Sequence, residues 1–323
     1  MKLDNKKIVV TGGAGLIGSH LVDQLLKTRV REVIVIDNLT RGNLGNLAQA
    51  AKDPRLQFHQ LDICSSAKIE PYFSGADGCF HLAALRITQC ASEPRLALDI
   101  MINGSYNVFE ACVKHRIKKV IFSSTASIYG MADHFPTDEK HHPWNNQTWY
   151  GATKLAGESM LKTFQDMFDL NYIALRYFNV YGPRMDVFGK YTEVLIRWIE
   201  QIENGQKPKI FGDGKQTMDF IYVEDVAKAN ILAMESDVNN DVFNIASGIE
   251  TSLLDLLHHL TSALKIDSIQ PEFLPDRKVN PVPRRLAEVR KAKEILGFSA
   301  KTGLEAGLQK LIEWRKQMTV KQK

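Results

Sequence analysis

The chain has 323 residues, of which 44% are hydrophobic and 24% charged, a composition typical of a globular protein with a large core. Its formal net charge of +4, from 41 basic and 37 acidic residues, is too small to predict a nucleic-acid partner. No apolar run reaches membrane-spanning length, and the polar residues 1–7 lead directly into a first strand, so we expect a cytoplasmic protein with no membrane partner.

The first predicted elements are a strand, a tight glycine turn and a helix. Residues 8–10 form a short apolar run, and apolar residues recur at helical spacing over 16–26. Between them, Gly12, Gly15 and Gly18 stand three apart, a spacing that lets the backbone turn sharply and approach a pyrophosphate at a helix start. Glycines also punctuate ordinary turns, so the motif alone leaves nucleotide binding and a plain turn open.

A second apolar run, residues 31–36, ends in Asp37, at the distance of about 20 residues that follows such a motif in dinucleotide-binding proteins. A carboxylate there accepts hydrogen bonds from both hydroxyls of an adenosine ribose and repels a 2′-phosphate. We therefore expect NAD rather than NADP. Arg41 follows in a loop rich in Gly, Asn and Thr. An arginine in that loop could bind the 2′-phosphate of NADP, so NADP remains an alternative.

Two further strands are predicted at 56–61 and 78–84. Asp62 directly follows the first, where it either contacts the adenine amino group or caps the next helix. The second strand runs into small residues, which leave room for a ligand at the carboxyl edge of a parallel sheet. A long helix is then predicted over 96–115, with Asn103 in its middle, where an asparagine needs a specific hydrogen-bond partner.

The fifth predicted strand, 119–125, ends in three hydroxyl residues, and the loop after it contains the adjacent histidines His141 and His142. Adjacent histidines do not converge easily on one ion, and no acidic or thiol partner stands nearby, so we expect a polar loop and no metal site. The four cysteines show no C-x-x-C pairing, and we expect free thiols, three of them in apolar surroundings.

Tyr150 and Lys154 stand near the start of the next predicted helix, which runs to about Phe168. They are one helical turn apart and project from the same face. An ammonium close to a phenol lowers the pKa of the phenol toward working pH, which would make Tyr150 a usable base. The same spacing also occurs in simple surface contacts. In chain order, Tyr150 and Lys154 follow the glycine motif, the strand that ends in an acid and the strand that ends in hydroxyl residues. This combination favours a catalytic role for the pair over a surface contact.

Five segments of the chain match one family pattern: Thr11–Gly18 (TGGAGLIG), Asp37, Ser123–Gly130 (SSTASIYG), Tyr150–Lys154 (YGATK) and Arg176–Pro183 (RYFNVYGP). Together they resemble the extended short-chain dehydrogenase/reductases. Within that group the chain looks most like the NAD-dependent nucleotide-sugar epimerase/dehydratase branch, typified by UDP-glucose 4-epimerase. The resemblance spans nearly the whole chain, and it is more specific for the family than for the substrate.

The resemblance implies a Rossmann-type doubly wound parallel sheet with a smaller α/β substrate-binding lobe. Residues 1–181 would form the NAD-binding domain, which 219–247 rejoins, and 182–323 would form mainly the lobe. The resemblance implies that Tyr150 is the catalytic base and that Lys154 lowers the pKa of Tyr150 and holds the nicotinamide ribose. It also implies that Thr125 hydrogen-bonds the reacting sugar oxygen.

The resemblance also implies two sets of binding residues. Those expected around NAD are Gly12, Gly15, Leu16, Ile17, Asp37, Asn38, Leu39, Thr40, Arg41, Asp62, Ile63, Leu82, Ala83, Ala84, Arg86, Ser123, Tyr150, Lys154, Tyr177, Phe178 and Val180. Those expected to bind the nucleotide-sugar substrate are Arg86, Thr125, Ala126, Tyr150, Asn179, Tyr191, Ile210, Phe211, Arg277 and Arg285.

Two absences narrow the expected reaction. Dehydratases of this branch carry an Asp-Glu pair directly after the catalytic threonine, where this chain has Ala126 and Ser127, and decarboxylases tend to have a glutamate at the second position. We therefore expect epimerisation at C4 of a nucleotide-linked sugar, with a UDP-sugar as substrate. A dehydratase or reductase of the same fold is one alternative, and a non-catalytic dinucleotide-binding sensor is another.

In the second lobe the pattern departs from the family. Met218 stands where the family has an arginine that contacts the diphosphate, and Arg277 matches another phosphate-binding arginine. Arg284 and Arg285 lie at the position that limits sugar size in 4-epimerases. An arginine there either meets a carboxylate, as in a uronic acid, or forms a salt bridge at the surface, and we favour the surface interpretation.

We expect a homodimer, because members of this family often pair through two helices of each subunit. The candidate helices here are 96–115 and 150–168.

Overall fold

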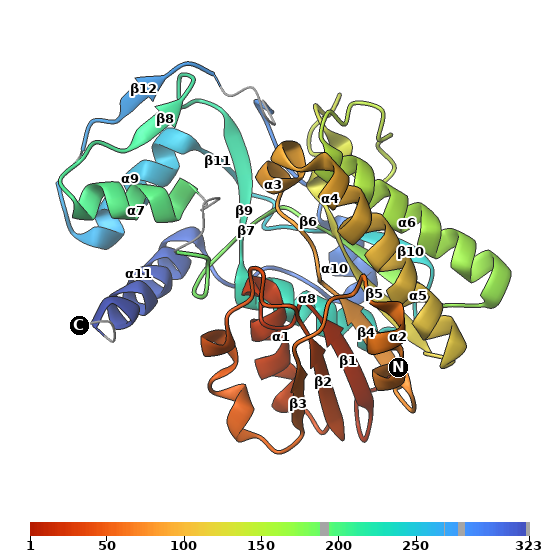
Figure 1. Ribbon diagram of the computed structural model, residues 1–323. Helices are drawn as coiled ribbons and strands as arrows, with labels where there is room; N and C mark the ends of the chain where they lie inside the picture. Colours follow the sequence, from red (N-terminus) through yellow and green to blue (C-terminus); the bar gives the residue numbers. More distant parts are fainter. Residues whose placement is uncertain (188–193, 268, 277–281, 321–323) are drawn as a thin grey trace.

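The computed structural model describes residues 1–187, 194–267, 269–276 and 282–320. Its centre is a sheet of seven parallel strands in the order β10-β6-β5-β4-β1-β2-β3 (Figure 1). These strands are β1 (Lys7–Thr11), β2 (Glu32–Ile36), β3 (Leu56–His59), β4 (Gly78–His81), β5 (Lys119–Thr125), β6 (Tyr172–Tyr177) and β10 (Asp241–Ile245). The expected doubly wound parallel sheet is confirmed.

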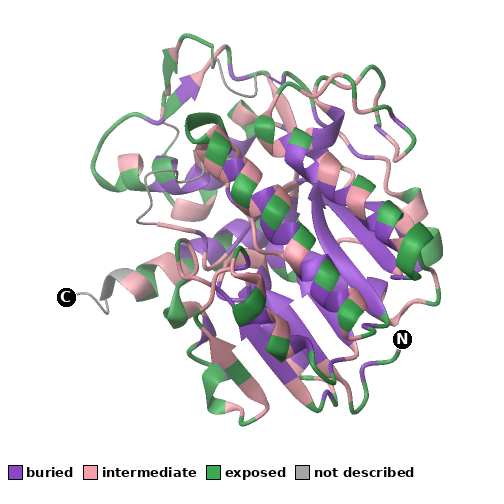
Figure 2. Cartoon of the chain, turned by 45° about the vertical axis from the view of Figure 1, so that its right-hand side comes forward, coloured by how far each residue is buried: buried purple, intermediate pink, exposed green. Residues whose placement is uncertain are grey.

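Helices cover both faces of this sheet, because its strands send apolar side chains alternately to either side. One face carries α1 (Leu16–Leu26), α8 (Val223–Glu235) and α10 (Arg290–Leu296), and the other carries α2 (Ser66–Ile69), α5 (Ser105–Lys114) and α6 (Trp149–Phe168). In β1, Ile8 and Val10 pack in the first core and Val9 in the second. Figure 2 shows the strands buried beneath helices whose outer faces are exposed.

A smaller lobe lies beyond the carboxyl edge of the sheet, at upper left in Figure 1. It holds a three-stranded sheet of β11 (Glu250–Ser252), β9 (Thr217–Tyr222) and β7 (Asn179–Tyr181), and a two-stranded sheet of β12 (Glu272–Leu274) and β8 (Lys209–Phe211). Three helices complete it: α7 (Val194–Glu203), α9 (Leu253–Leu264) and α11 (Leu304–Val320). Trp198, Leu256 and Leu311 lie in its separate core.

The chain crosses between the two parts more than once. β9 pairs inside the small sheet, but the next helix, α8, packs beside α1, and β10 pairs with β6 at the edge of the large sheet. Residues 223–245 therefore return from the lobe to the large sheet. The two parts are thus joined by more than one segment of the chain.

The long helix expected over 96–115 is interrupted. After α3 (Ile87–Ser92), α4 (Pro94–Leu98) is followed by a π-helical stretch, Asp99–Gly104, and only then by α5. At the junction with α5, the Ser105 hydroxyl donates to the Met101 carbonyl, four residues earlier, at 2.7 Å. Apolar periodicity does not distinguish a π turn from a regular turn, so the sequence pattern runs through it.

None of the helices in the described ranges combines the length and the apolar character needed to cross a bilayer.

Candidate active site

A cleft of about 1540 Å³ lies at the carboxyl edge of the large sheet, and residues of the smaller lobe line its other side. Its walls include all the described residues that we expected to hold NAD or substrate, except Leu39. Tyr191 and Arg277, which were also expected to bind substrate, lie outside the described residues.

The glycine turn after β1 forms a tight cradle at one end of this cleft. Gly12 has a φ of +72°, and a Cβ there would lie 2.6 Å from the backbone nitrogen of Ala83. A Cβ on Gly18 would lie 2.2 Å from the Gly12 carbonyl oxygen, so only glycine lets α1 pack against the turn. Gly15 precedes α1 and provides no side-chain cap. The N–H groups of the first helical turn therefore suit an anion such as a pyrophosphate.

Asp37 stands at the end of β2 and is held by the backbone. Its Oδ2 accepts a hydrogen bond from the Ala14 N–H at 3.0 Å and its Oδ1 accepts one from the Leu39 N–H at 2.8 Å. Burial raises the pKa of Asp37 above its ordinary value, although these two N–H groups and Arg41 oppose the rise. Leu39 contributes only this backbone N–H, because its side chain packs against the core beneath α1, so the expected contact of Leu39 with the cleft is not found.

Asp62, at the end of β3, lines the cleft and does not cap a helix. Its Oδ1 accepts from the Cys64 N–H at 2.8 Å and its Oδ2 accepts from Asn38 Nδ2 at 3.0 Å. Burial raises the pKa of Asp62, but the two hydrogen bonds outweigh it and hold the pKa below its ordinary value. The N-cap of α2 is Ser65, so the capping interpretation of Asp62 is wrong.

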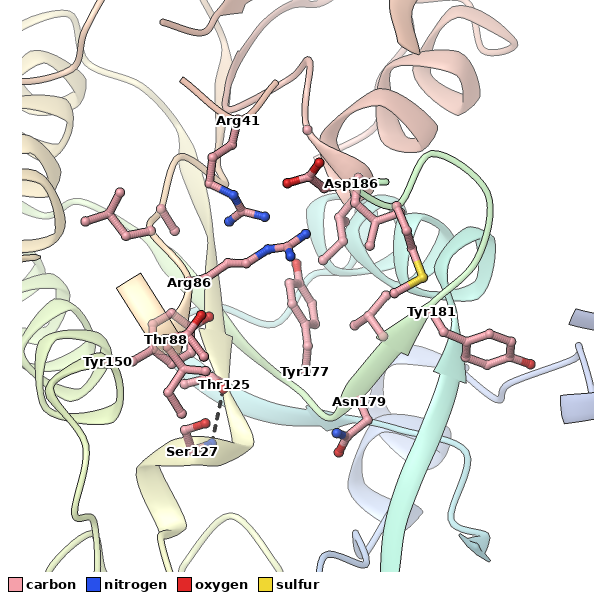
Figure 3. A pocket seen from close by; sticks show the side chains of 18 of the residues that line it. Arg41, Arg86, Thr88, Thr125, Ser127, Tyr150, Tyr177, Asn179, Tyr181 and Asp186 are labelled. Atoms are coloured by element: carbon pink, nitrogen blue, oxygen red, sulfur yellow. Dashed lines mark hydrogen bonds between the residues drawn. The ribbon is translucent and has the colours of Figure 1, made fainter. Parts of the chain in front are cut away.

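The expected catalytic side chains meet in the middle of the cleft. Figure 3 shows Tyr150, Thr88 and Thr125 grouped on one wall of the pocket. Lys154, one turn after Tyr150, donates from Nζ to the Ser123 carbonyl at 2.6 Å. Burial lowers the pKa of Lys154 to about 7.

A buried histidine links the glycine turn to α5. His81, at the end of β4, faces Thr11 of β1, and its Nδ1 lies 2.7 Å from the Thr11 hydroxyl. Its Nε2 lies 3.0 Å from the Ser105 hydroxyl, whose hydrogen goes to the Met101 carbonyl. His81 Nε2 must therefore carry the proton, and Nδ1 accepts from Thr11. Burial lowers the pKa of His81 to about 3, with Lys154 as a second cause, so the imidazole is neutral at working pH.

A buried ion pair fixes α6, the helix that carries the tyrosine and the lysine. Arg176 of β6 donates from Nε and Nη2 to the two carboxylate oxygens of Glu158 at 2.9 and 2.6 Å. The Ser124 hydroxyl of β5 donates to the same carboxylate at 2.6 Å. Arg176 also donates to the Tyr129 hydroxyl at 3.0 Å, which in turn donates to Asn244 of β10 at 2.6 Å. The network joins α6 to three strands of the sheet.

Other charged groups gather farther along the cleft. Figure 3 shows Arg41 and Arg86 pointing into the pocket near Asp186, away from Thr125. Met218 lines the cleft at β9, where the family pattern has an arginine. The positive charge available to a bound diphosphate therefore comes from other positions in this chain.

The two arginines of the second lobe have different environments. Arg284 is exposed, pairs with Glu250 at 2.7 Å and lies over the Phe135 ring at 4.6 Å. Arg285 is buried, lines the cleft and donates from Nη1 to the Ala126 carbonyl at 2.8 Å. The surface interpretation is correct for Arg284 and wrong for Arg285, because the backbone between them alternates its side chains between solvent and the cleft.

The histidine loop does have an acidic partner, contrary to our expectation. Asp133, His141 and His142 bring their potential ligand atoms within 4.8 Å of one another. The Asp133 N–H donates to His141 Nε2 at 2.9 Å, His141 Nδ1 bonds the His142 carbonyl at 2.7 Å, and His142 Nε2 bonds the Asp133 carboxylate at 2.8 Å. These ring nitrogens are already engaged in hydrogen bonds, so the cluster can close this loop by itself.

Two residues of the cleft region carry no signal in the sequence. Thr88 lines the cleft, and its hydroxyl is one of four buried polar side-chain atoms without a hydrogen-bond partner among the described residues. His81 lies in an apolar run, where a histidine is not distinguishable from a core residue by pattern. The cysteines follow expectation: Cys79, Cys90 and Cys112 are buried free thiols.

Comparison with known proteins identifies the family. A family model described as the NAD dependent epimerase/dehydratase family matches residues 8–246. The chain belongs to this family. A putative UDP-glucose 4-epimerase from Methanocaldococcus jannaschii is 36% identical over 313 residues, which cover 96% of this chain and 98% of the relative.

Solved structures of other family members have the same fold over nearly their whole length. A UDP-N-acetylglucosamine 4-epimerase from Methanobrevibacter ruminantium M1, in complex with UDP-N-acetylmuramic acid, has a TM-score of 0.91 at 36% identity and covers 98% of this chain and 99% of that one. A UDP-glucuronic acid 4-epimerase from Bacillus cereus, solved with UDP-glucuronic acid and NAD, has a TM-score of 0.87 at 31% identity and covers 97% and 99%.

The cofactor of this epimerase/dehydratase family member is NAD, and the cleft fits it. The cradle at Gly12 and the uncapped start of α1 suit the pyrophosphate, and the carboxylate of Asp37 stands where it can accept from both ribose hydroxyls. Lys154 and Tyr150 line the same cleft. The chain is thus a member of an NAD-dependent epimerase and dehydratase family, with a cleft that fits this cofactor.

Proposed function

We propose that the protein is an NAD-dependent epimerase that inverts C4 of a UDP-linked sugar through a transient 4-keto sugar. The observation that carries the proposal is the meeting of Tyr150, Thr125 and Lys154 in one cleft with the glycine cradle. Oxidation of a secondary alcohol needs a base at the hydroxyl oxygen and a hydride acceptor at the carbon of the same group. The UDP-linked sugars in the two related complexes support UDP as the carrier.

Each side chain has a defined task in this proposal. Bound NAD supplies reversible hydride transfer at C4. Tyr150 takes the proton of the C4 hydroxyl and later returns it, and Thr125 holds the same oxygen by a hydrogen bond. Lys154, in its ammonium form, favours the phenolate form of Tyr150 by its charge. The keto sugar turns over between proton removal and proton return, so the new hydroxyl has the opposite configuration.

The residues after Thr125 favour epimerisation over elimination. Ala126 and Ser127 line the cleft where a dehydratase needs an acid and a base for the loss of water. A dinucleotide sensor is disfavoured for another reason, since it has no use for a buried lysine one turn from a tyrosine in the cleft. These side chains support an enzyme that returns its cofactor to the starting state in each turnover.

The decisive experiment follows C4 inversion by proton NMR with UDP-glucose, UDP-N-acetylglucosamine and UDP-glucuronate. We expect inversion of at least one sugar by the natural protein. Tyr150→Phe is expected to lower the rate by about 10²- to 10⁴-fold, because the general base is lost. NAD content, measured by absorbance after denaturation, should stay unchanged, because the cradle is intact.

Tyr106→Phe is the matched control, since Tyr106 is an exposed tyrosine of α5 outside the cleft, and it should keep full activity. Appreciable inversion by Tyr150→Phe would contradict the mechanism. Accumulation of reduced cofactor or of a 4-keto-6-deoxy sugar would instead identify the redox or dehydratase alternative.

A further inference from the structure

Arg285 is an arginine in the wall of the cleft. Only 7% of the residue is exposed, and it lies beside the turn that follows β5. Its Nη1 donates to the Ala126 carbonyl at 2.8 Å, which brings the guanidinium to the residue that follows Thr125 in the chain. A cation is thereby placed at the turn that begins after Thr125, the residue that would hold the reacting sugar oxygen in the proposed function.

The backbone of the lobe holds Arg285 in this place. Its N–H donates to the Thr217 carbonyl of β9 at 2.9 Å, and two residues later the Ala287 N–H lies 3.3 Å from an Asp219 carboxylate oxygen. Asp219 also accepts from the N–H and the hydroxyl of Ser247. These contacts fix the backbone that carries Arg285, and none of them uses its side chain or a ligand.

The surroundings of Arg285 strengthen its attraction for an anion. Ala126, Phe178 and Ala287 form an apolar cluster beside it. Burial lowers the pKa of Arg285 to about 10, so it is still charged at neutral pH but poorly solvated. In such a setting the attraction between opposite charges is several times stronger than in water, and a planar guanidinium matches a carboxylate in geometry.

We propose that Arg285 recognises a carboxylate on the sugar itself, so that the substrate is a UDP-linked acidic sugar. This inference rests on the proposed function, because Thr125 must hold the C4 oxygen. The ring carbons next to C4 are C3 and C5. The carboxylate therefore belongs either to C6 of a uronate or to an acidic ether on O3, and both present the same anion to Arg285.

The diphosphate is the other anion of such a substrate, and the cleft offers it different cations. Arg41 and Arg86 point into the pocket away from Thr125 (Figure 3), and the cleft is also lined by Arg197 of α7 and by Arg184, which pairs with Asp23 of α1 at 2.6 Å. Arg285 is the arginine tied to the turn after β5. Its position therefore favours contact with the sugar over contact with the diphosphate.

The first test measures kcat/KM of the natural holoenzyme for two acidic and two neutral substrates. UDP-glucuronate carries the carboxylate at C6 and UDP-N-acetylmuramate carries it on O3, whereas UDP-glucose and UDP-N-acetylglucosamine carry none. We expect one acidic sugar to exceed both neutral sugars by at least about tenfold, and the better of the two identifies the carboxylate position. A higher kcat/KM for a neutral sugar overturns the proposal.

The second test uses Arg285→Gln, with Arg285→Lys as the charge-conserving variant and Arg284→Gln as the matched control on the exposed neighbour. Arg285→Gln should lower kcat/KM for the acidic sugar by about 30-fold or more, because a buried charge pair is lost, and should change the neutral sugars and the Kd of UDP far less. Arg285→Lys should recover part of the loss, and Arg284→Gln should change neither class.

Equal losses for all sugars together with weaker UDP binding would show that Arg285 binds the diphosphate, which overturns the inference and leaves C4 epimerisation intact. If no sugar is inverted at C4, or if Tyr150→Phe keeps its activity, the proposed function itself fails. The preference of the natural protein requires no variant, so it decides the inference even if Arg285→Gln does not fold.

Discussion

Two side chains of the cleft region with buried polar atoms, His81 and Thr88, differ in how their hydrogen-bonding groups are satisfied. His81 has a partner on each ring nitrogen, whereas the Thr88 hydroxyl has none among the described residues. A satisfied buried group supports the fold, and an unsatisfied one is destabilising until a ligand or water meets it. The two side chains therefore lead to opposite predictions for stability.

His81 makes the folded protein sensitive to acid. Its folded pKa of about 3 lies below the ordinary value of 6.5, so between these pH values the unfolded chain binds a proton that the folded chain does not. Stability is therefore lost as the pH falls through this window, by about 1.4 kcal/mol per pH unit. Urea unfolding at pH 6.5 and 4.5 should show a loss about 2 kcal/mol smaller for His81→Gln than for the natural protein, because the unfolded histidine is already half protonated at pH 6.5. Equal losses in the two proteins would mean that His81 is protonated in the fold.

Thr88→Val should not destabilise the protein. The substitution conserves the shape and removes a buried hydroxyl that bonds no described residue, so the free energy of unfolding should stay constant or rise by up to about 2 kcal/mol. Thr11→Val is the matched control, because it removes a hydroxyl bonded to His81 at 2.7 Å and should cost about 1–3 kcal/mol. Urea unfolding without substrate compares the two. A loss in Thr88→Val as large as that in Thr11→Val would refute the assignment.

At the scale of elements, α6 has to be placed accurately, because it carries Tyr150 and Lys154. Thr148 caps it by accepting from the Gly151 N–H at 3.0 Å, so the helix begins just before the tyrosine. One turn beyond the lysine, Glu158 binds Arg176 and Ser124 of neighbouring strands. The start of the helix and its rotation about its axis are therefore fixed by separate contacts.

Glu158→Gln should be strongly destabilising. It leaves the buried Arg176 charge uncompensated, a change that typically costs about 3–5 kcal/mol. The same helix offers a matched control in the exposed pair Lys162–Asp166, where the ion pair spans 3.4 Å and Asp166→Asn should cost under about 1 kcal/mol. Urea unfolding of both variants gives the difference. Similar small losses would show that water reaches Arg176 and replaces the carboxylate.

The elements of the large sheet could be predicted because their signals are local. Apolar runs mark β1, β2 and β5, and the helical spacing of Tyr150 and Lys154 needs only their separation in sequence. The π-helical stretch before α5 gives no such signal, since apolar periodicity does not distinguish a π turn from a regular turn. The pairing of β9 with β7 and β11 is also a long-range choice between two sheets.

At the scale of the whole molecule, the cleft exists because two parts of the chain meet. The cofactor side could be predicted from the glycine motif and Asp37, which lie close together in sequence. The approach of Arg285 to Ala126 could not, because it joins segments 159 residues apart whose relative position depends on tertiary packing. The contact of Asp133 with His141 lies within one loop, whose conformation follows no periodic pattern. The lobe side of the cleft thus depends on contacts that sequence patterns describe least well.

The outer surfaces of α5 and α6 expose large apolar side chains at the same side of the sheet. Tyr106 of α5 is 46% exposed and its ring lies 5.4 Å from that of Phe164 of α6, while Phe168 and Met167 at the end of α6 are 51% and 66% exposed. Apolar side chains gathered on one face are typical of protein–protein contacts. We propose that this face joins two copies of the chain in a homodimer.

Sedimentation equilibrium at micromolar concentration tests the dimer, which should have twice the 36.4 kDa mass of the chain. The double variant Tyr106→Glu with Phe168→Glu should sediment as a monomer, because four unpaired carboxylates would be buried in a two-fold interface. Trp144→Ser is the matched control, since Trp144 is 82% exposed but lies in the histidine loop, and it should remain dimeric. A natural protein that sediments at 36.4 kDa would exclude the dimer. A double variant that stays dimeric would place the contact on another face. Activity measured on the same monomeric variant would then show whether each cleft works alone.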